Sequence, residues 1–307
     1  MDYMYEDPRT GYMVTGPACS PENKFQVGDR EYALDMMPTC DIAIIRELLE
    51  SCIKSATLLK LDRQFADRAE AFVRKLPPYK TDSKGRLQEW YFDHEESLPH
   101  HRHMTHLLSV FPYSSIKPEV TPELAEAAWK SVLSRTTPKE NWEDTGWARS
   151  LLILNSARLW KEEEAYNNVM EMLRLLTEDN LMVIHPPTAG AKSNVYELDG
   201  NTGMCMGVTE MLLQSHFKAG EIKSETLNCD TEAPVLHFLP ALPSEWSEGE
   251  IHGLLARGGF EVDIKWENNM LVEARIVSKL GKPGVLRYGD KFEVVELKAG
   301  ESYNWQI

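Results

Sequence analysis

The hydrophobic pattern of this chain changes once, near residue 230, and this change constrains the fold more than any other feature. From about residue 38 to residue 218, apolar side chains recur at helical spacing. After residue 230, apolar and polar residues alternate, as they do in strands with one buried face. The sequence therefore predicts a mainly α chain with a β tail, in which a helical part at 1–230 precedes a small antiparallel β domain at 231–307.

About seven helices are expected in the helical part. Thr121 is placed to cap one of them, with Pro122 at the first helical position, where a missing N–H is tolerated. The stretch 146–160 is apolar nearly all round, which is typical of an inner, buried helix. The expected helices cover residues 38–59, 62–76, 101–111, 121–133, 146–160, 163–176 and 203–216.

A β-hairpin is expected in the tail, between about residues 260 and 277. Asn268-Asn269 separates two alternating stretches and is a plausible tight turn. The side chains expected on the buried face are Phe260, Val262, Ile264, Trp266, Val272, Ala274 and Ile276.

The charge balance disfavours some classes of partner. Lys plus Arg is 33 and Asp plus Glu is 48, so the net charge is −15. Nucleic acids and anionic membranes need clustered positive charge, so we expect neither as a partner.

Five scattered cysteines without a CxxC pair disfavour a disulfide framework or a zinc knuckle. No basic-then-apolar signal peptide opens the chain, no apolar run has membrane-spanning length, and no cofactor is expected.

The segments between the expected helices are rich in Trp, His, Asp and Asn, where ordinary loops favour Gly, Ser and Lys. Aromatic faces stack on the apolar face of a sugar ring, and carboxylates and amides bind its hydroxyls. This composition is therefore typical of a sugar-binding site. The segments are "SPENKF" at 20–25, "LQEWYFDHEESLPHHRHMTHL" at 87–107, "NWEDTGW" at 141–147 and "HPPTAGAKSNVYELDGNTG" at 185–203.

Each of these segments also has a purely structural interpretation. Glu22, between a proline and an asparagine, could be an ordinary solvated loop glutamate. The histidines clustered at 100–106 could line a pocket, cap a helix or satisfy an interior hydrogen bond. A metal site there lacks the HExxH pattern and a carboxylate or Cys at fixed spacing. Asp199 or Asn201 could simply be the N-cap of the following helix.

Taken together, the segments resemble glycoside hydrolase family 95, the inverting α-L-fucosidases and related α-L-galactosidases. The similar blocks follow one another in the family's order and include a Gln-Glu-Trp, a Thr-Gly-Trp and an Asp-Gly-Asn motif. They span nearly the whole chain. The blocks lie at residues 11–25, 87–112, 145–160, 184–216 and 239–266.

The resemblance implies a partial (α/α)6 toroid followed by the small antiparallel β domain. In the family a β domain precedes the complete (α/α)6 barrel, and this chain resembles only the second half. The leading β domain, the early barrel helices and their water-positioning Asn-x-Asn pair have no counterpart in this sequence. We therefore expect the chain to be inactive alone, with an oligosaccharide as substrate and the missing N-terminal half of the enzyme as partner.

The resemblance also implies roles for individual residues. Glu22 is expected to be the general acid, which must be protonated near neutral pH and therefore needs an enclosed site. Asp199 is expected to polarise the amide pair that activates water, on the other side of an inverting site. Trp147 is expected to form a wall of the pocket. The residues expected to bind sugar hydroxyls are His101, Arg102, His103, His106 and Asn201.

Two departures from the family pattern leave open whether the sugar is fucose or galactose. "GWARSLLIL" lacks the Trp-Lys that often follows Thr-Gly-Trp, and "DGNTGMCMG" replaces a commoner Phe-Gly-Gly version. Two other functions also stay open. One is a different (α/α)6 sugar enzyme, such as a phosphorylase or lyase, although no convincing phosphate nest or basic cluster is present. The other is a carbohydrate-binding or structural fragment without turnover.

Overall fold

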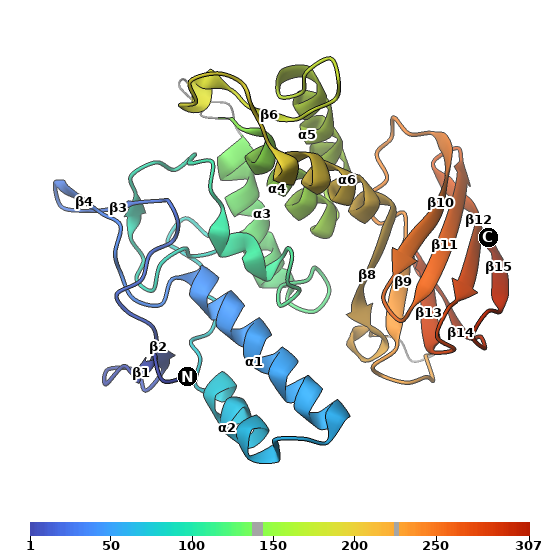
Figure 1. The fold of residues 1–307 in the computed structure, drawn as a ribbon, viewed down its shortest axis with the longest axis horizontal. Helices are drawn as coiled ribbons and strands as arrows, with labels where there is room; N and C mark the ends of the chain where they lie inside the picture. Colours follow the sequence, from blue (N-terminus) through green and yellow to red (C-terminus); the bar gives the residue numbers. More distant parts are fainter. Residues whose placement is uncertain (137–143, 224–226) are drawn as a thin grey trace. The chain divides into compact units, whose positions relative to one another are not determined.

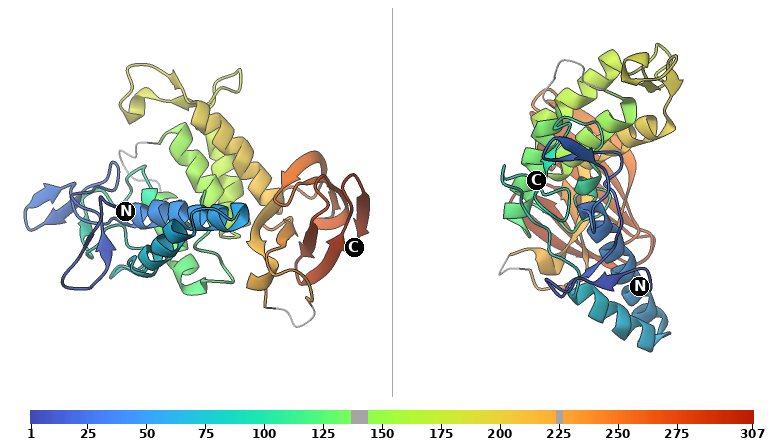
Figure 2. Two further views of the ribbon diagram at one scale, coloured as in Figure 1. Left: turned by 60° about the horizontal axis from the view of Figure 1, so that its bottom comes forward. Right: turned by 90° about the vertical axis from the view of Figure 1, so that its left-hand side faces the viewer.

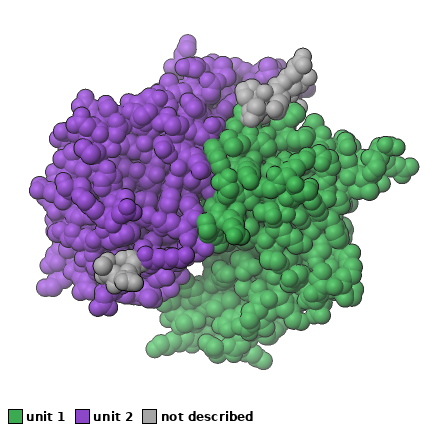
Figure 3. Space-filling model, turned by 180° about the vertical axis from the view of Figure 1, so that it is seen from behind, with its two compact units in different colours: residues 1–117, 121–143 green, residues 118–120, 144–307 purple. Residues whose placement is uncertain are grey.

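A computed structural model describes residues 1–136, 144–223 and 227–307 of the chain. Within these ranges, six α-helices lie between residues 39 and 212, and a strand-rich region follows (Figure 1). This order confirms the predicted change from helix to strand along the chain. The chain divides into two compact units: unit 1 comprises residues 1–117 and 121–143, and unit 2 comprises residues 118–120 and 144–307 (Figure 3).

Unit 1 contains three α-helices in its described part, α1 (Thr39–Leu59), α2 (Arg63–Arg74) and α3 (Pro122–Thr136). The start of α3 at Pro122 agrees with the prediction. The strands of this unit are only two or three residues long, so loops make up much of it. They are β1 (Tyr5–Glu6), β2 (Met13–Val14), β3 (Phe25–Val27), β4 (Arg30–Tyr32) and β5 (Glu95–Glu96).

The helix expected at 101–111 does not form; only a short 3₁₀ helix at Thr105–Ser109 is present. In an α-helix over 101–111 the N–H of Leu107 would donate to the carbonyl oxygen of His103, four residues back. Instead, Leu107 N donates to Met104 O, three residues back, at 2.9 Å. Before this turn, side chains bond the backbone: His103 N donates to Nδ1 of His101 at 3.0 Å, and Pro99 O accepts from Nη1 of Arg135 at 2.6 Å.

Unit 2 begins with three helices packed together: α4 (Gly146–Arg158), α5 (Glu162–Leu175) and α6 (Leu198–Leu212). Residues are buried all round α4, as predicted for an inner helix. The side chain of Thr145 caps its start by accepting a hydrogen bond from Ala148 N at 3.4 Å. Between α5 and α6 the chain forms a small ribbon of two strands, β6 (Ile184–His185) and β7 (Val195–Tyr196).

The chain passes directly from α6 into a strand, β8 (Leu213–Lys218), so the helix predicted through residue 216 is wrong over its last four residues. Leu213 pairs with Phe238 in β9 (Pro234–Phe238), 25 residues further along the chain. This pairing buries Leu213, Gln214 and Phe217. Long-range strand pairing therefore overrides the local helical pattern, and the β region takes its first strand from before residue 231.

The strand-rich region consists of two four-stranded sheets. One has the order β14-β13-β9-β8 and the other the order β10-β11-β12-β15; Figure 2 shows these strands in orange to red. Every pair of neighbours is antiparallel except β9 and β13, which are parallel. The remaining strands are β10 (Glu248–Ala256), β11 (Phe260–Glu267), β12 (Met270–Ser278), β13 (Pro283–Tyr288), β14 (Lys291–Glu296) and β15 (Ser302–Gln306).

The two sheets share one apolar core. Phe238 from one sheet and Trp305 from the other have ring centroids 5.6 Å apart, and both rings are buried. Phe260, Val262 and Ile276 belong to the same cluster of side chains. The alternation that predicted strands in the sequence thus corresponds to the inward faces of these sheets.

The predicted hairpin forms from β11 and β12, with a difference in register. Asn268 and Asn269 have φ of 52° and 57°, as expected for a two-residue turn of this kind. Lys265 pairs with Glu273 but Trp266 pairs with Leu271, so Val272 is an extra residue in a β-bulge. Leu271 is 2% exposed and Val272 38% exposed. The prediction that Val272 faces the core is therefore wrong.

In the part of the chain that the structure describes, no helix is both long enough and apolar enough to cross a bilayer.

The bulge buries Leu271 but leaves Val272 partly exposed, and unfolding experiments can measure the difference in their contributions to stability. We expect Leu271→Ala to lower the free energy of unfolding by about 2–5 kcal/mol, because it leaves a cavity in the core. Val272→Ala should cost less than about 1 kcal/mol. The measurement is urea denaturation of both variants followed by circular dichroism. Strict alternation predicts the reverse ranking, and finding that ranking would rule out the bulge.

Candidate active site

Glu22 lies in a loop between β2 and β3, and its side chain is 66% exposed. Its backbone N–H donates to Nδ1 of His103 at 3.1 Å. Nη2 of Arg102 donates to Glu22 Oε2 at 3.3 Å, and Nε2 of His103 lies 3.6 Å from the same oxygen. The structure therefore brings three of the predicted site residues together within unit 1. The enclosure expected around a general acid is not provided by the described residues.

His103, beside Glu22, and its neighbour His101 are held in the neutral form. Burial and the nearby charge of Arg102 lower the pKa of His103, although the Glu22 carboxylate opposes this shift. Burial, followed by His103 and Arg102, lowers the pKa of His101 to about 3. Because Nδ1 of His103 accepts the Glu22 N–H, its ring proton is on Nε2, which faces the carboxylate.

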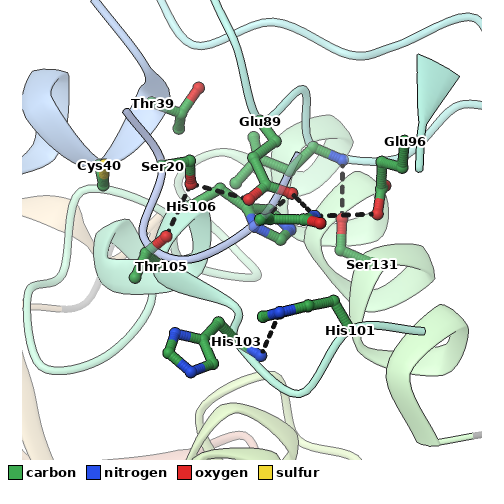
Figure 4. Close-up of polar contacts among 12 residues, drawn as sticks. Ser20, Thr39, Cys40, Glu89, Glu96, His101, His103, Thr105, His106 and Ser131 are labelled. Atoms are coloured by element: carbon green, nitrogen blue, oxygen red, sulfur yellow. Dashed lines mark hydrogen bonds and ion pairs between the residues drawn. The ribbon is translucent and has the colours of Figure 1, made fainter. Parts of the chain in front are cut away.

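A buried polar cluster lies behind this loop (Figure 4). Glu89 is 4% exposed and Arg135 1% exposed, and Nη2 of Arg135 donates to Glu89 Oε2 at 3.0 Å. Nη1 of Arg135 donates to Oε2 of Glu96 at 2.6 Å. Ser20 Oγ donates to Glu89 Oε1 at 2.7 Å, and Asn23 Nδ2 donates to Glu89 Oε2 at 3.1 Å. The residues on both sides of Glu22 are thus bound to one buried carboxylate.

His106 belongs to this buried cluster and not to the exposed surface near Glu22. Its side chain is 3% exposed, and its Nδ1 lies 3.6 Å from Glu89 Oε2. Burial and the charge of Arg135 lower its pKa to about 3. This position favours the interior role that was open for the clustered histidines over a direct contact with a sugar hydroxyl.

Asp199 lies in unit 2, exposed in the first turn of α6. This helix begins at Leu198, so the hypothesis that Asp199 or Asn201 is its N-cap is wrong. A Cβ added to Gly200 would lie 3.0 Å from the Gly146 carbonyl carbon and 3.1 Å from Trp147 N. The absence of a side chain at Gly200 therefore lets the first turns of α4 and α6 touch, which places Asp199 and Trp147 on adjoining helix ends.

Glu197 is a residue of this region that the sequence analysis missed. It is 9% exposed, and its Oε2 accepts the Trp147 N–H at the start of α4, at 2.9 Å. Burial raises its pKa, with a further contribution from Asp199, while the Trp147 N–H opposes the shift. An acidic group here also suits the positive end of the helix dipole.

The amide of Asn201 is already engaged by the backbone beside it. Its Oδ1 accepts from Val183 N at 2.8 Å, and its Nδ2 donates to Leu181 O at 3.0 Å. Asn201 therefore secures the chain just before β6. Of the predicted segment 141–147, residues 141–143 lie outside the described residues. In the described ranges, no group of three or more His, Cys, Asp or Glu is arranged to hold a metal ion.

Neither Glu89 nor Glu197 was singled out from the sequence alone, for the same physical reason. Glu89 stands inside a quoted motif, but its partner Arg135 is 46 residues away. Glu197 is 50 residues from its partner, Trp147. Neither pairing has a local signal, because the contacts form only when distant segments pack together.

The chain belongs to glycoside hydrolase family 95. The model of the "Glycosyl hydrolase family 95 catalytic domain" matches residues 1–212, and that of the "Glycoside hydrolase family 95, C-terminal domain" matches residues 231–306. These matches confirm the resemblance inferred from the sequence motifs.

Named relatives are similar to the chain over most of its length. It is 32% identical to "Alpha-L-fucosidase 2" of Arabidopsis thaliana over 279 residues, covering 86% of this chain and 30% of that protein. It is 24% identical to "Probable alpha-fucosidase A" of Aspergillus oryzae over 283 residues, covering 86% of this chain and 36% of that protein. The chain therefore spans only about a third of the length of these relatives.

A solved structure has a similar fold. It is named "Putative kojibiose phosphorylase from human microbiome" and superposes with a TM-score of 0.56, covering 99% of this chain and 39% of that one. The two sequences are 8% identical, so the similarity concerns the fold alone.

The burial of His106 predicts a pH dependence of stability. Its pKa is about 3 in the folded chain and about 6.5 when unfolded, so the unfolded state binds the extra proton between these values. The contribution of the neutral His106 ring to the free energy of unfolding is fully present above pH 6.5 and is lost as the pH falls toward 3. We expect His106→Gln to flatten the fall of the free energy of unfolding between pH 7 and pH 4.5, measured by urea denaturation, by up to about 1.4 kcal/mol per pH unit.

The matched control is His252→Gln, because the side chain of His252 is 68% exposed. This variant should follow the pH dependence of the unmodified chain. If the curve for His106→Gln also ran parallel to that of the unmodified chain, the interior neutral role of His106 would be wrong.

Proposed function

We propose that this chain is part of an inverting glycoside hydrolase that releases terminal α-L-fucose or α-L-galactose from glycans. The observation that carries the proposal is the exposed Glu22 carboxyl beside Arg102 and His103, in a chain of family 95. The fucosidase names of the relatives support the choice of sugar.

Glu22 acts in this proposal as the general acid that protonates the leaving oxygen. A general acid must reach the glycosidic oxygen, and the side chain of Glu22 is exposed while its neighbours Ser20 and Asn23 are buried. Arg102 and the Nε2–H of neutral His103 supply hydrogen-bond donors beside it, which suits the binding of uncharged sugar hydroxyls.

Asp199 acts as the carboxylate that polarises the water-binding amides, with Trp147 as a wall of the pocket. Both belong to the adjoining first turns of α4 and α6, where Glu197 is a second carboxylate. Inverting hydrolysis needs water on the face of the sugar opposite the acid, with the two carboxyl groups about 6.5–9.5 Å apart.

We further propose that residues 1–230 include part of an (α/α)6 toroid and that residues 231–307 form the small β domain, with β8 as an added strand of one of its sheets. Helices α1 to α6 supply about half of such a toroid. The relatives are about three times as long as the matched segment, which leaves room for the other helices, the amide pair and the enclosure of Glu22 in the rest of the enzyme.

The proposal predicts how activity depends on the leaving group. In the whole enzyme, Glu22→Gln should lower kcat/KM on a fucosyl or galactosyl disaccharide by about 10²–10⁴-fold, because a basic alkoxide needs protonation as it leaves. A nitrophenyl glycoside, whose leaving group is already stable, should lose far less. Steady-state kinetics on both substrates make the measurement.

Glu31→Gln is the control, because Glu31 is also an exposed glutamate of unit 1. It should leave both rates unchanged. Equal losses on both substrates for Glu22→Gln would mean that Glu22 binds sugar and does not donate a proton.

The proposal also predicts that the chain alone lacks turnover. Positioning of reacting groups supplies about 7–11 kcal/mol of a barrier, or roughly five to eight decades in rate. We expect no appreciable fucose or galactose release from α-1,2-linked substrates by residues 1–307, and some release when the other half of the enzyme is added in trans. Robust turnover by the chain alone would place the water-activating groups within these residues. Turnover that required phosphate would instead indicate a phosphorylase.

A further inference from the structure

The loop that carries Glu22 is anchored on both sides of this residue by a single side chain. Ser20 and Asn23 are 0% and 1% exposed, whereas the side chain of Glu22 between them is 66% exposed. Ser20 bonds to Oε1 of Glu89 and Asn23 to Oε2, so each anchor uses a different oxygen of one carboxylate. Two anchors on a rigid group fix the direction in which the residues between them point.

The anchored loop and Glu89 both lie against the segment that contains Arg102 and His103. Thr105 Oγ1 lies 2.7 Å from Ser20 Oγ and 3.3 Å from the Pro21 carbonyl oxygen. His106 Nδ1 lies 3.6 Å from Glu89 Oε2. Glu89 therefore stands between two segments that are about 80 residues apart in the chain and meet at Glu22.

The charges around Glu89 are compensated within unit 1. Arg135 donates to Glu89 and Glu96, and Nη1 of Arg86 lies 2.8 Å from Glu96 Oε1. These four side chains form a sequence of alternating charges, all at most 11% exposed. A buried ion pair gives little net stability over apolar packing, but it holds its partners in one geometry. The position of this cluster directly behind the loop suggests that its geometry matters to Glu22.

We propose that Glu89 is a positioning residue, which aligns the Glu22 carboxyl with the donors on Arg102 and His103. It does so by bonding to Ser20 and Asn23, and Ser20 in turn lies within hydrogen-bond distance of Thr105. The role of Glu22 as the acid rests on the proposed function, whereas the alignment by Glu89 is a property of this chain and can be tested without activity.

The first test measures the loop in the full chain by NMR. The Glu22 N–H donates to His103 Nδ1, so its hydrogen exchange reports directly on the alignment. Glu89→Gln should speed exchange of the Glu22 amide by roughly tenfold or more, and the ¹⁵N shifts of the His103 ring should show loss of the fixed tautomer. Ser20→Ala, which leaves the charges intact, should give the same effects if Glu89→Gln fails to fold.

Glu210→Gln is the matched control, because Glu210 is 4% exposed and paired with a buried arginine, Arg158, through bonds of 2.6 and 2.8 Å. It is the same chemical change in unit 2, so it should leave the Glu22 amide and the His103 ring unchanged. Unchanged exchange in both Glu89→Gln and Ser20→Ala would overturn the proposal, as would an equal effect of Glu210→Gln.

The second test measures catalysis by the whole enzyme. Misplacing a reacting group by 1 Å can cost about 10²-fold, so Glu89→Gln should lower kcat on a disaccharide by about that factor with little change in KM. The loss should be smaller on a nitrophenyl glycoside. The double variant with Glu22→Gln and Glu89→Gln should lose no more kcat than Glu22→Gln alone, because both substitutions impair the same proton donation by Glu22.

The two tests separate the two proposals. Equal losses on both substrates, or fully additive losses in the double variant, would overturn the positioning role. An enzyme that hydrolysed neither fucosides nor galactosides would overturn the proposed function, and the exchange measurement would still decide the role of Glu89.

Discussion

The arrangement of unit 1 depends on the buried ion pair between Glu89 and Arg135. The two side chains are 3% and 1% exposed, and removing the charge of Arg135 would leave Glu89 buried and uncompensated, at a cost of about 3–5 kcal/mol. The strands of this unit are too short to order its long loops through sheet hydrogen bonds. The ion pair and its hydrogen-bonded partners order them instead, connecting α3 with the loops at 20–23 and 87–96.

The same polar interior explains the chemistry of the surface around Glu22. Burial keeps His101 and His103 neutral, so Arg102 is the cation beside the Glu22 carboxylate. Neutral imidazoles can donate and accept hydrogen bonds, which suits the recognition of uncharged hydroxyl groups. In unit 2, acidic groups lie instead at the positive ends of α4 and α6, where Glu197 accepts the Trp147 N–H.

Unit 2 is ordered by apolar packing to a much greater extent. Helix α4 is buried all round, and the two sheets enclose a common core that includes Phe238, Phe260 and Trp305. The direct passage from α6 into β8 joins the helical and strand-rich parts of this unit, because Leu212 and Leu213 both belong to that core. The two units are thus ordered by different kinds of interaction.

The sequence by itself determined the features that depend on neighbouring residues: helix α4, the start of α3 at Pro122, the Asn268-Asn269 turn and the change from helix to strand. Ordered motifs also determined the family, and with it the grouping of Glu22, Arg102 and His103. Only the tertiary structure decided that 101–111 is not an α-helix, that 213–218 is a strand and that Val272 forms a bulge. The pairing of Glu89 with Arg135 and of Glu197 with Trp147 was also decided only by the tertiary structure. In each case the deciding partner is distant in sequence or lies on a paired strand, and burial makes that contact stronger than the local preference.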